Sequence, residues 1–239
     1  MSHGWARWLG CILLAVSAAG AAQGPGQSQS SSSSKHTKNT SARSVPDIAD
    51  GTVANGVYRN RALALTCKIP AGWVLRTEEM NAREDETGSE AKSSPRGTPL
   101  DQAQGRQGST GESSGGMVLL AAFSRPPDAR GEDVNASIVI AGEPITAYPG
   151  LKEAAQYFGP LTEVAKAQGF IVDEEPYEIE IGTKVVVRGD FHKDVGSRVM
   201  RQSTLAFLGQ GHAVSITVIG GTEDEVEQLI GGVSFGAGK

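Results

Sequence analysis

The chain has 239 residues, of which 38% are hydrophobic, and its 22 Lys and Arg against 27 Asp and Glu give a formal net charge of −5 at pH 7. This composition excludes a wholly disordered, collagenous or transmembrane protein, because enough apolar side chains are present to form a core. It also argues against nucleic-acid binding, which needs clustered cations. The one such cluster, Lys35, His36 and Lys38, lies in a polar N-terminal stretch.

Residues 1–22 have the pattern of an export signal. Arg7 supplies positive charge before the apolar run Leu9–Ala22, which ends in small side chains that a signal peptidase accepts. This run is shorter than the roughly 20 residues that a membrane-spanning helix needs. The sequence therefore predicts an exported protein, periplasmic or extracellular, whose mature form starts near Ala22 or Gln23. Cleavage would also remove Cys11 and leave a single cysteine, which excludes an intramolecular disulfide.

Two further segments are predicted to lie outside the core. Residues 23–52 are rich in Gly, Pro, Gln and Ser and are expected to form a disordered linker. Residues 79–116 contain almost no large apolar side chain and read as a low-complexity insert at a hairpin tip. Without these segments and the signal, about 150 residues remain, the size of one domain. We place this single domain at residues 53–239.

Strands are predicted on both sides of the insert. Leu63–Ile69 alternates between apolar and polar residues, which indicates a strand with one buried face. Cys67 lies on that face and is expected to be an inert small hydrophobe rather than a reactive thiol. A second strand starts at Trp73–Thr77, and the apolar run Met117–Phe123 and the segment Val134–Ala141 follow as the third and fourth.

The segment Leu151–Gln168 predicts a helix, because its apolar residues recur every three or four positions. Pro160 lacks an amide proton, so we expect it, with Gly159, to kink or split this helix. Gly169 suits a left-handed cap at the end of the helix.

The C-terminal part predicts a meander and a second helix. Thr222 and Glu225 have the spacing of a capping box, and apolar residues follow on one helical face. Strands in two runs, each followed by a helix, predict an α+β fold with a largely antiparallel sheet packed against helices. The meander strands are expected at Tyr177–Ile181, Lys184–His192, Arg198–Leu208 and His212–Ile219.

Two stretches of the chain resemble the PsbP-like proteins, the family of the extrinsic photosystem II protein and its non-photosynthetic bacterial relatives. The first is Tyr58–Asn60 with Leu65–Trp73 (LTCKIPAGW), and the second is the strand, capped helix and terminal Ser-Phe of Gly211–Phe235. The resemblance spans roughly residues 57 to 236 and breaks at the long insert. It implies an α/β/α sandwich and a role in protein binding or complex assembly without catalysis. No site residue is carried over from it.

Catalytic and metal-binding patterns are weak. Ser234 lies in a G-x-S-x-G pattern, but a predicted helix precedes it, whereas a hydrolase nucleophile elbow needs a strand before the serine and a helix after it. Asp190 and His192 share one face of a strand and are the best metal-ligand candidates. His212 is expected about 20 Å from His192, too far to share an ion. A solvated surface cluster with Arg188 is the favoured alternative.

The sequence therefore predicts an exported, monomeric, noncatalytic binding or assembly module of the cell envelope, whose partner is a protein or an envelope component. The alternative is a hydrolase or metal-dependent enzyme whose site is not recognisable from sequence. Candidate contact residues are Trp73, beside a tight turn, and His212, beside the turn Gly209–Gly211. The favoured alternative for Trp73 is a core position. No metal or other cofactor is expected.

Overall fold

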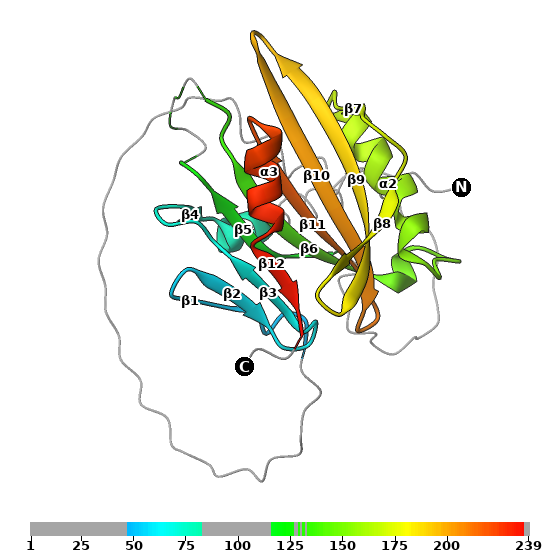
Figure 1. The fold of residues 1–239 in the computed structure, drawn as a ribbon. Helices are drawn as coiled ribbons and strands as arrows, with labels where there is room; N and C mark the ends of the chain where they lie inside the picture. Colours follow the sequence, from blue (N-terminus) through cyan, green and yellow to red (C-terminus); the bar gives the residue numbers. More distant parts are fainter. Residues whose placement is uncertain (1–46, 83–115, 127–128, 130, 132, 237–239) are drawn as a thin grey trace, which may run out of the picture.

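The computed structural model describes residues 47–82, 116–126, 129, 131 and 133–236, and antiparallel strands dominate it (Figure 1). A four-stranded sheet has the order β1-β2-β3-β12, and an eight-stranded sheet has the order β4-β5-β6-β11-β10-β9-β7, with β8 also paired to β9. The small sheet comprises β1 (Thr52–Ala54), β2 (Val57–Asn60), β3 (Leu65–Lys68) and β12 (Val233–Phe235). The large sheet comprises β4 (Val74–Leu75), β5 (Met117–Phe123), β6 (Ser137–Pro144), β7 (Ile171–Val172), β8 (Tyr177–Ile181), β9 (Lys184–Val195), β10 (Arg198–Gly209) and β11 (His212–Gly220).

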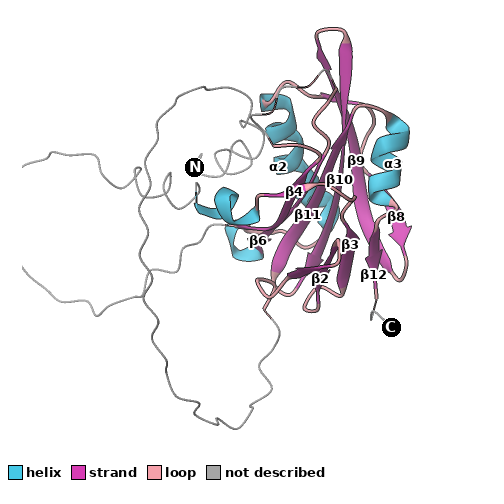
Figure 2. Cartoon of the chain, turned by 90° about the vertical axis from the view of Figure 1, so that its left-hand side faces the viewer, coloured by secondary structure: helices cyan, strands magenta, loops and turns pink. Residues whose placement is uncertain are grey.

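Helices lie on both faces of the large sheet (Figure 2). One face packs against α2 (Ala154–Ala167), and the other packs against α3 (Glu223–Ile230) together with the small sheet. The alternation of β10 shows why: Leu205 and Phe207 enter the main core between the sheets, whereas Ala206 lies under α2. A short 3-10 turn, η2 (Ile145–Ala147), and a short helix at 77–82 complete the described elements.

Helix α2 is anchored near its N-terminal end. Phe158 is buried against β9, where Gly189 leaves the room it needs, because a Cβ there would lie 2.5 Å from the Phe158 Cε1 atom. The helix continues past Pro160 as one element, so the prolyl residue does not split it. It ends as expected at Gly169, whose φ of 85° suits glycine.

The sequence placed the start of the domain and the start of the insert incorrectly. Ile48, assigned to the linker, is 1% exposed in the main core, and its carbonyl accepts a hydrogen bond of 2.6 Å from the Asn60 side chain. Met80, assigned to the insert, packs on the cluster around Val118, and the Asn81 side chain bonds both the N–H and C=O of Val118 at 2.9 Å. Most of the predicted insert, residues 83–115, lies outside the described residues. So do residues 1–46, which include the predicted signal and most of the predicted linker.

The predicted fold is correct at the level of a mixed α and β protein built mainly from antiparallel strands. The second sheet was not predicted, and the α/β/α layering is not specifically confirmed. The second sheet was missed because it depends on the pairing of β12 with β3, in which Ser234 lies opposite Thr66, a residue far away along the chain. Such a long-range pairing leaves no local pattern, and it closes the main core with Phe235, which packs edge-to-face on Phe207.

Candidate functional site

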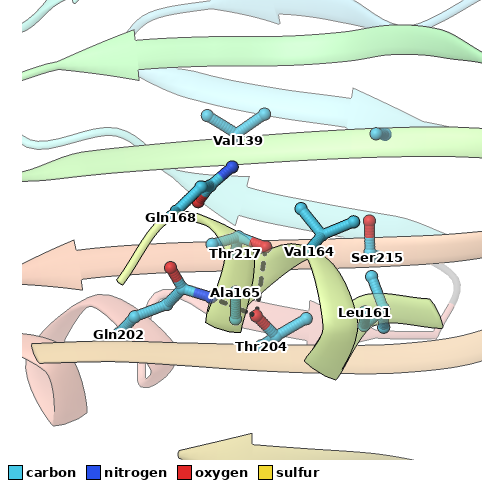
Figure 3. A pocket seen from close by; sticks show the side chains of 10 residues that line it. Val139, Leu161, Val164, Ala165, Gln168, Gln202, Thr204, Ser215 and Thr217 are labelled. Atoms are coloured by element: carbon cyan, nitrogen blue, oxygen red, sulfur yellow. Dashed lines mark hydrogen bonds between the residues drawn. The ribbon is translucent and has the colours of Figure 1, made fainter. Parts of the chain in front are cut away.

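A groove lies between α2 and the large sheet (Figure 3). Its cavity volume is about 30 Å³, which holds about two or three water molecules. No lining side chain carries a charge. The apolar lining residues are Val139, Ala141, Leu161, Val164 and Ala165, and the polar ones are Gln168, Gln202, Thr204, Ser215 and Thr217.

The floor of the groove is polar although a helix covers this face of the sheet. Thr204 of β10 lies opposite Thr217 of β11, and their Oγ1 atoms are 3.2 Å apart. Gln202, two residues earlier on the same face, donates from Nε2 to the Thr204 Oγ1 at 3.3 Å. Burial of polar groups under a helix is unfavourable unless each group is hydrogen-bonded, so a complete network is the expected arrangement here.

One atom of this network has no partner. Gln202 is 6% exposed, and within the described part of the chain its Oε1 accepts no hydrogen bond. A buried polar atom without a partner costs on the order of 1–3 kcal/mol of stability. Such an atom in a groove lining marks a place where a donor from another molecule would be favourable.

The helical wall of the groove begins immediately after Pro160. Leu161, Val164 and Ala165 all follow the proline, and they face the polar floor in Figure 3. Because proline has no N–H, the carbonyl of Gln156 lacks its usual helical donor. The wall is therefore the half of α2 beyond a gap in its hydrogen-bond ladder.

A buried carboxyl group adjoins the groove. Glu143 is 6% exposed and accepts a hydrogen bond of 2.9 Å from the Tyr157 hydroxyl and another from the Tyr148 hydroxyl. Burial raises the pKa of Glu143 and, with the neighbouring carboxyl, that of Tyr157. Ser215, which lines the groove, also hydrogen-bonds the Tyr157 side chain. Burial thus favours the uncharged forms of Glu143 and Tyr157, which lie beside the lining residue Ser215.

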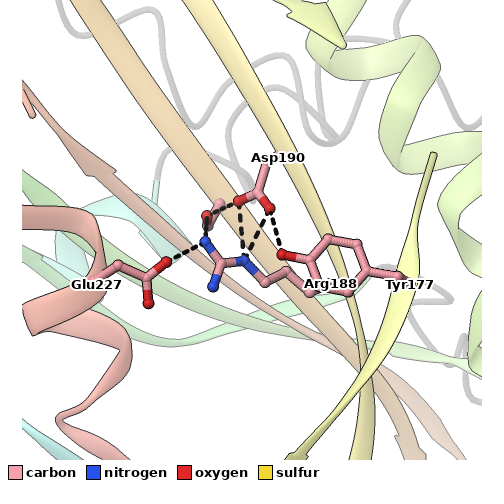
Figure 4. Close-up of polar contacts among 5 residues, drawn as sticks. Tyr177, Arg188, Asp190 and Glu227 are labelled. Carbon is pink, nitrogen blue, oxygen red and sulfur yellow. Dashed lines mark hydrogen bonds and ion pairs between the residues drawn. The ribbon is translucent and has the colours of Figure 1, made fainter. Parts of the chain in front are cut away.

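The metal-ligand candidate Asp190 belongs to a polar network beneath α3 (Figure 4). Its carboxylate accepts two bonds from the Arg188 Nε, at 3.0 and 2.9 Å, one from the Tyr177 hydroxyl at 3.0 Å and one from Ser203. Arg188 also pairs with Glu227 of α3. The Arg188 and Asp190 side chains are 13% and 15% exposed, so the predicted solvated cluster is wrong, because Tyr177 of β8 and Glu227 of α3 lie against them.

The polar groups of this network hydrogen-bond one another. Burial, helped by the hydrogen bond to Asp190, raises the pKa of Tyr177 to about 12. Because Arg188, Tyr177 and Ser203 all donate to Asp190, its oxygens are engaged by the protein itself. The Arg188–Glu227 ion pair links this network to α3.

The second metal-ligand candidate, His192, pairs instead with Asp173. His192 lies opposite Arg201, which lies opposite Gly220, and His212 is about eight residues further along β11, roughly 26 Å away. Among the described residues, no group of three or more His, Cys, Asp or Glu side chains could hold a metal ion.

The candidate contact residues do not meet at one place. Trp73 is partly buried and packs against the main core, as the core alternative expected. His212 begins β11, and its Nδ1 is 2.8 Å from the carbonyl of Gln210 in the β10–β11 turn. Neither residue lines the groove.

The candidate nucleophiles also lie apart from the groove. Ser234 is exposed on β12, between α3 and the end of the described chain, so the strand-serine-helix order of a nucleophile elbow is not present there. Cys67 is fully buried, and burial raises the pKa of its thiol to about 12, as expected of an inert cysteine.

Sequence reasoning missed the groove, although a signal was present. The short turn at Gln210 and Gly211 fixes the register of β10 and β11, and this register places Thr204 opposite Thr217. Polar residues at alternating positions of both strands therefore had to share one face. The position of α2 over that face had no comparable signal.

No protein-family model and no curated protein matches the chain. Solved structures similar to it include PA94 of Pseudomonas aeruginosa, a protein of unknown function, at 19% identity and a TM-score of 0.31, covering 42% of this chain and 68% of that one. Another is LpqN, involved in cell envelope biogenesis of Mycobacterium tuberculosis, at 10% identity and a TM-score of 0.32, covering 71% of this chain and 82% of that one. The similarity is distant, and the PsbP-like resemblance is not confirmed. No helix in the described part of the chain is long and apolar enough to cross a membrane.

Proposed function

We propose that this chain is an exported, noncatalytic binding module of the cell envelope and that the groove beneath α2 is its ligand site. The observation that carries this proposal is the Oε1 atom of Gln202, buried in the groove lining without a hydrogen-bond partner. A buried acceptor of this kind lowers stability, and a ligand that donates a hydrogen bond would remove that cost.

The chemistry of the lining supports binding rather than turnover. Hydrolytic catalysis needs a nucleophile held beside a base that activates it. The Thr204 and Thr217 hydroxyls in the groove are hydrogen-bonded to each other, and all ten lining residues are uncharged. Such a surface can select a molecule by shape and hydrogen bonding, which is the work of a binding module.

We also propose that the chain is exported and that it is a monomer. Residues 1–22 carry the signal pattern, and a mature chain starting near Gln23 would meet its ligand outside the cytoplasm. Mass spectrometry under denaturing conditions of the protein recovered from its own cells tests this part. An intact Met1 or a lipid on Cys11 would contradict it.

Mass spectrometry under native conditions tests the binding proposal. The protein recovered from its own cells is expected to carry a bound small molecule, and the Gln202→Met variant is expected to have lost it. Gln228→Met, the same change at an exposed position of α3, is the matched control and should retain the molecule. Equal occupancy of wild type and Gln202→Met, or none in either, would contradict the proposal.

A further inference from the structure

We infer that the groove takes an uncharged amphiphile, one that donates an N–H or O–H to the Gln202 Oε1 and lays a slender alkyl chain along the wall formed by Leu161 and Val164. This inference rests on the proposed function, because it specifies the ligand of the same site. It follows from three properties of the groove: the unpaired atom, the absence of charge in the lining and the small volume.

The unpaired atom determines the head group. The Nε2 of Gln202 is already engaged with Thr204 at 3.3 Å, so the free end of the amide is its oxygen, which only accepts. The ligand must therefore supply a donor. An alcohol or a primary or secondary amide does so, whereas an ether or an ester does not.

The lining determines the charge of the ligand. A charged head entering the groove would lose its hydration and find no opposite charge among the lining residues. The carboxyl of Glu143, linked to the lining residue Ser215 through Tyr157, already accepts hydrogen bonds from two tyrosine hydroxyls. An uncharged head is therefore preferred over an ammonium or a carboxylate.

The apolar wall and the width determine the tail. Leu161, Val164 and Ala165 face Val139 and Ala141 across the groove, so a chain between them would have hydrocarbon on both sides. The cavity volume of about 30 Å³, the space of about two or three water molecules, admits only the first atoms of a narrow chain and no ring, and the rest of the chain would lie beside the half-buried Val164 at the mouth of the groove. Each methylene that becomes buried should strengthen binding about fourfold.

Two-dimensional NMR of the exported chain with simple probes tests the inference. Hexan-1-ol should shift the side-chain amide of Gln202 and the backbone amides of Leu161 and Val164. 1-Methoxyhexane lacks the hydroxyl donor of hexan-1-ol, and hexylammonium replaces the hydroxyl with a positive charge. Both are expected to bind at least tenfold more weakly than hexan-1-ol.

The variants distinguish a specific hydrogen bond from a merely apolar cavity. In Gln202→Met, hexan-1-ol and 1-methoxyhexane should bind equally, whereas the exposed control Gln228→Met should keep the preference for the alcohol. Equal binding of the two probes to wild type, or no shift at the groove with 50 mM hexan-1-ol, would overturn the inference. If the ligand recovered from cells still depends on Gln202, the proposed function survives such a result. If that dependence also fails, both fall together.

Discussion

Glu143 is a buried carboxyl whose protonation should be visible in the stability of the protein. Because burial raises its pKa above the ordinary value of 4.5, the folded state holds this proton more tightly than the unfolded chain. The stabilisation is present in full below about pH 4.5 and is lost as the pH rises through the folded-state pKa. We therefore expect Glu143→Gln to be less sensitive to pH above 4.5 than the wild type.

Urea unfolding at a series of pH values measures this difference. Glu178→Gln, a change at an exposed position of β8, is the control and should keep the pH dependence of the wild type. If Glu143→Gln and wild type lose stability in parallel between pH 4.5 and 8, the carboxyl of Glu143 is not perturbed in the way described.

Cys67 gives a second prediction about a single side chain. It is 0% exposed, and with a thiol pKa of about 12 it should be neutral at pH 8. We expect the native exported chain not to react with iodoacetamide at pH 8, and to react fully once unfolded in urea. Labelling of the native protein at the rate of a free thiol would show that the β3 face opens readily.

The contrast between Cys67 and Gln202 shows what a sequence reveals about single residues. Cys67 follows from the alternation of β3 alone, because the period of the strand assigns it to the buried face. Whether Gln202 is buried depends on what covers its face of β10, and α2 comes from an earlier, separate part of the chain. Burial by a distant element leaves no mark in the local pattern.

At the scale of elements, the helix at 77–82 determines how much of the predicted insert can be replaced without loss of stability. Replacing residues 83–115 with a short Gly-Ser loop should leave the melting temperature nearly unchanged, since the cost of closing a loop varies slowly with its length. Replacing residues 79–115 should lower it, because Met80 leaves its apolar cluster and Asn81 no longer bonds Val118. Thermal unfolding of the two variants measures the difference.

The expected loss in the longer replacement is about 2–4 kcal/mol, from one partly buried methionine and two hydrogen bonds. In a domain of this size this corresponds to a drop of several degrees or more in melting temperature. Equal melting temperatures for the two replacements would show that Met80 and Asn81 do not stabilise the edge of β5.

Some elements were predictable because their evidence is local. The strands β9, β10 and β11 follow from alternation and short turns, and α3 follows from its capping pattern, since Thr222 accepts from the Glu225 N–H at 3.2 Å. The Glu225 carboxylate accepts a hydrogen bond from the Gly221 N–H, whereas a complete capping box would have it accept from the Thr222 N–H. That detail depends on how β11 leads into the helix.

At the scale of the whole molecule, the arrangement of layers creates the groove. The face of the large sheet toward α3 and the small sheet carries the main apolar core and the hydrogen-bonded network of Arg188 and Asp190, whereas the opposite face is covered by a single helix, α2 (Figure 2), and includes a polar floor in which the Gln202 Oε1 accepts no hydrogen bond from the described residues. No short stretch of sequence contains this asymmetry, because it arises where β10, β11 and α2 meet. We attribute the polar floor to ligand binding.

The free energy of unfolding of Gln202→Met is the most direct measure of whether Gln202 is kept for a ligand, since it requires no knowledge of that ligand. Methionine has nearly the shape of glutamine, and it would remove the unpaired buried oxygen while Thr204 retains Thr217 as a partner. Urea unfolding of the ligand-free exported chain should therefore find the variant at least as stable as the wild type and as Gln228→Met. A loss of more than about 1 kcal/mol would contradict the account, because it would show that Gln202 serves the fold itself.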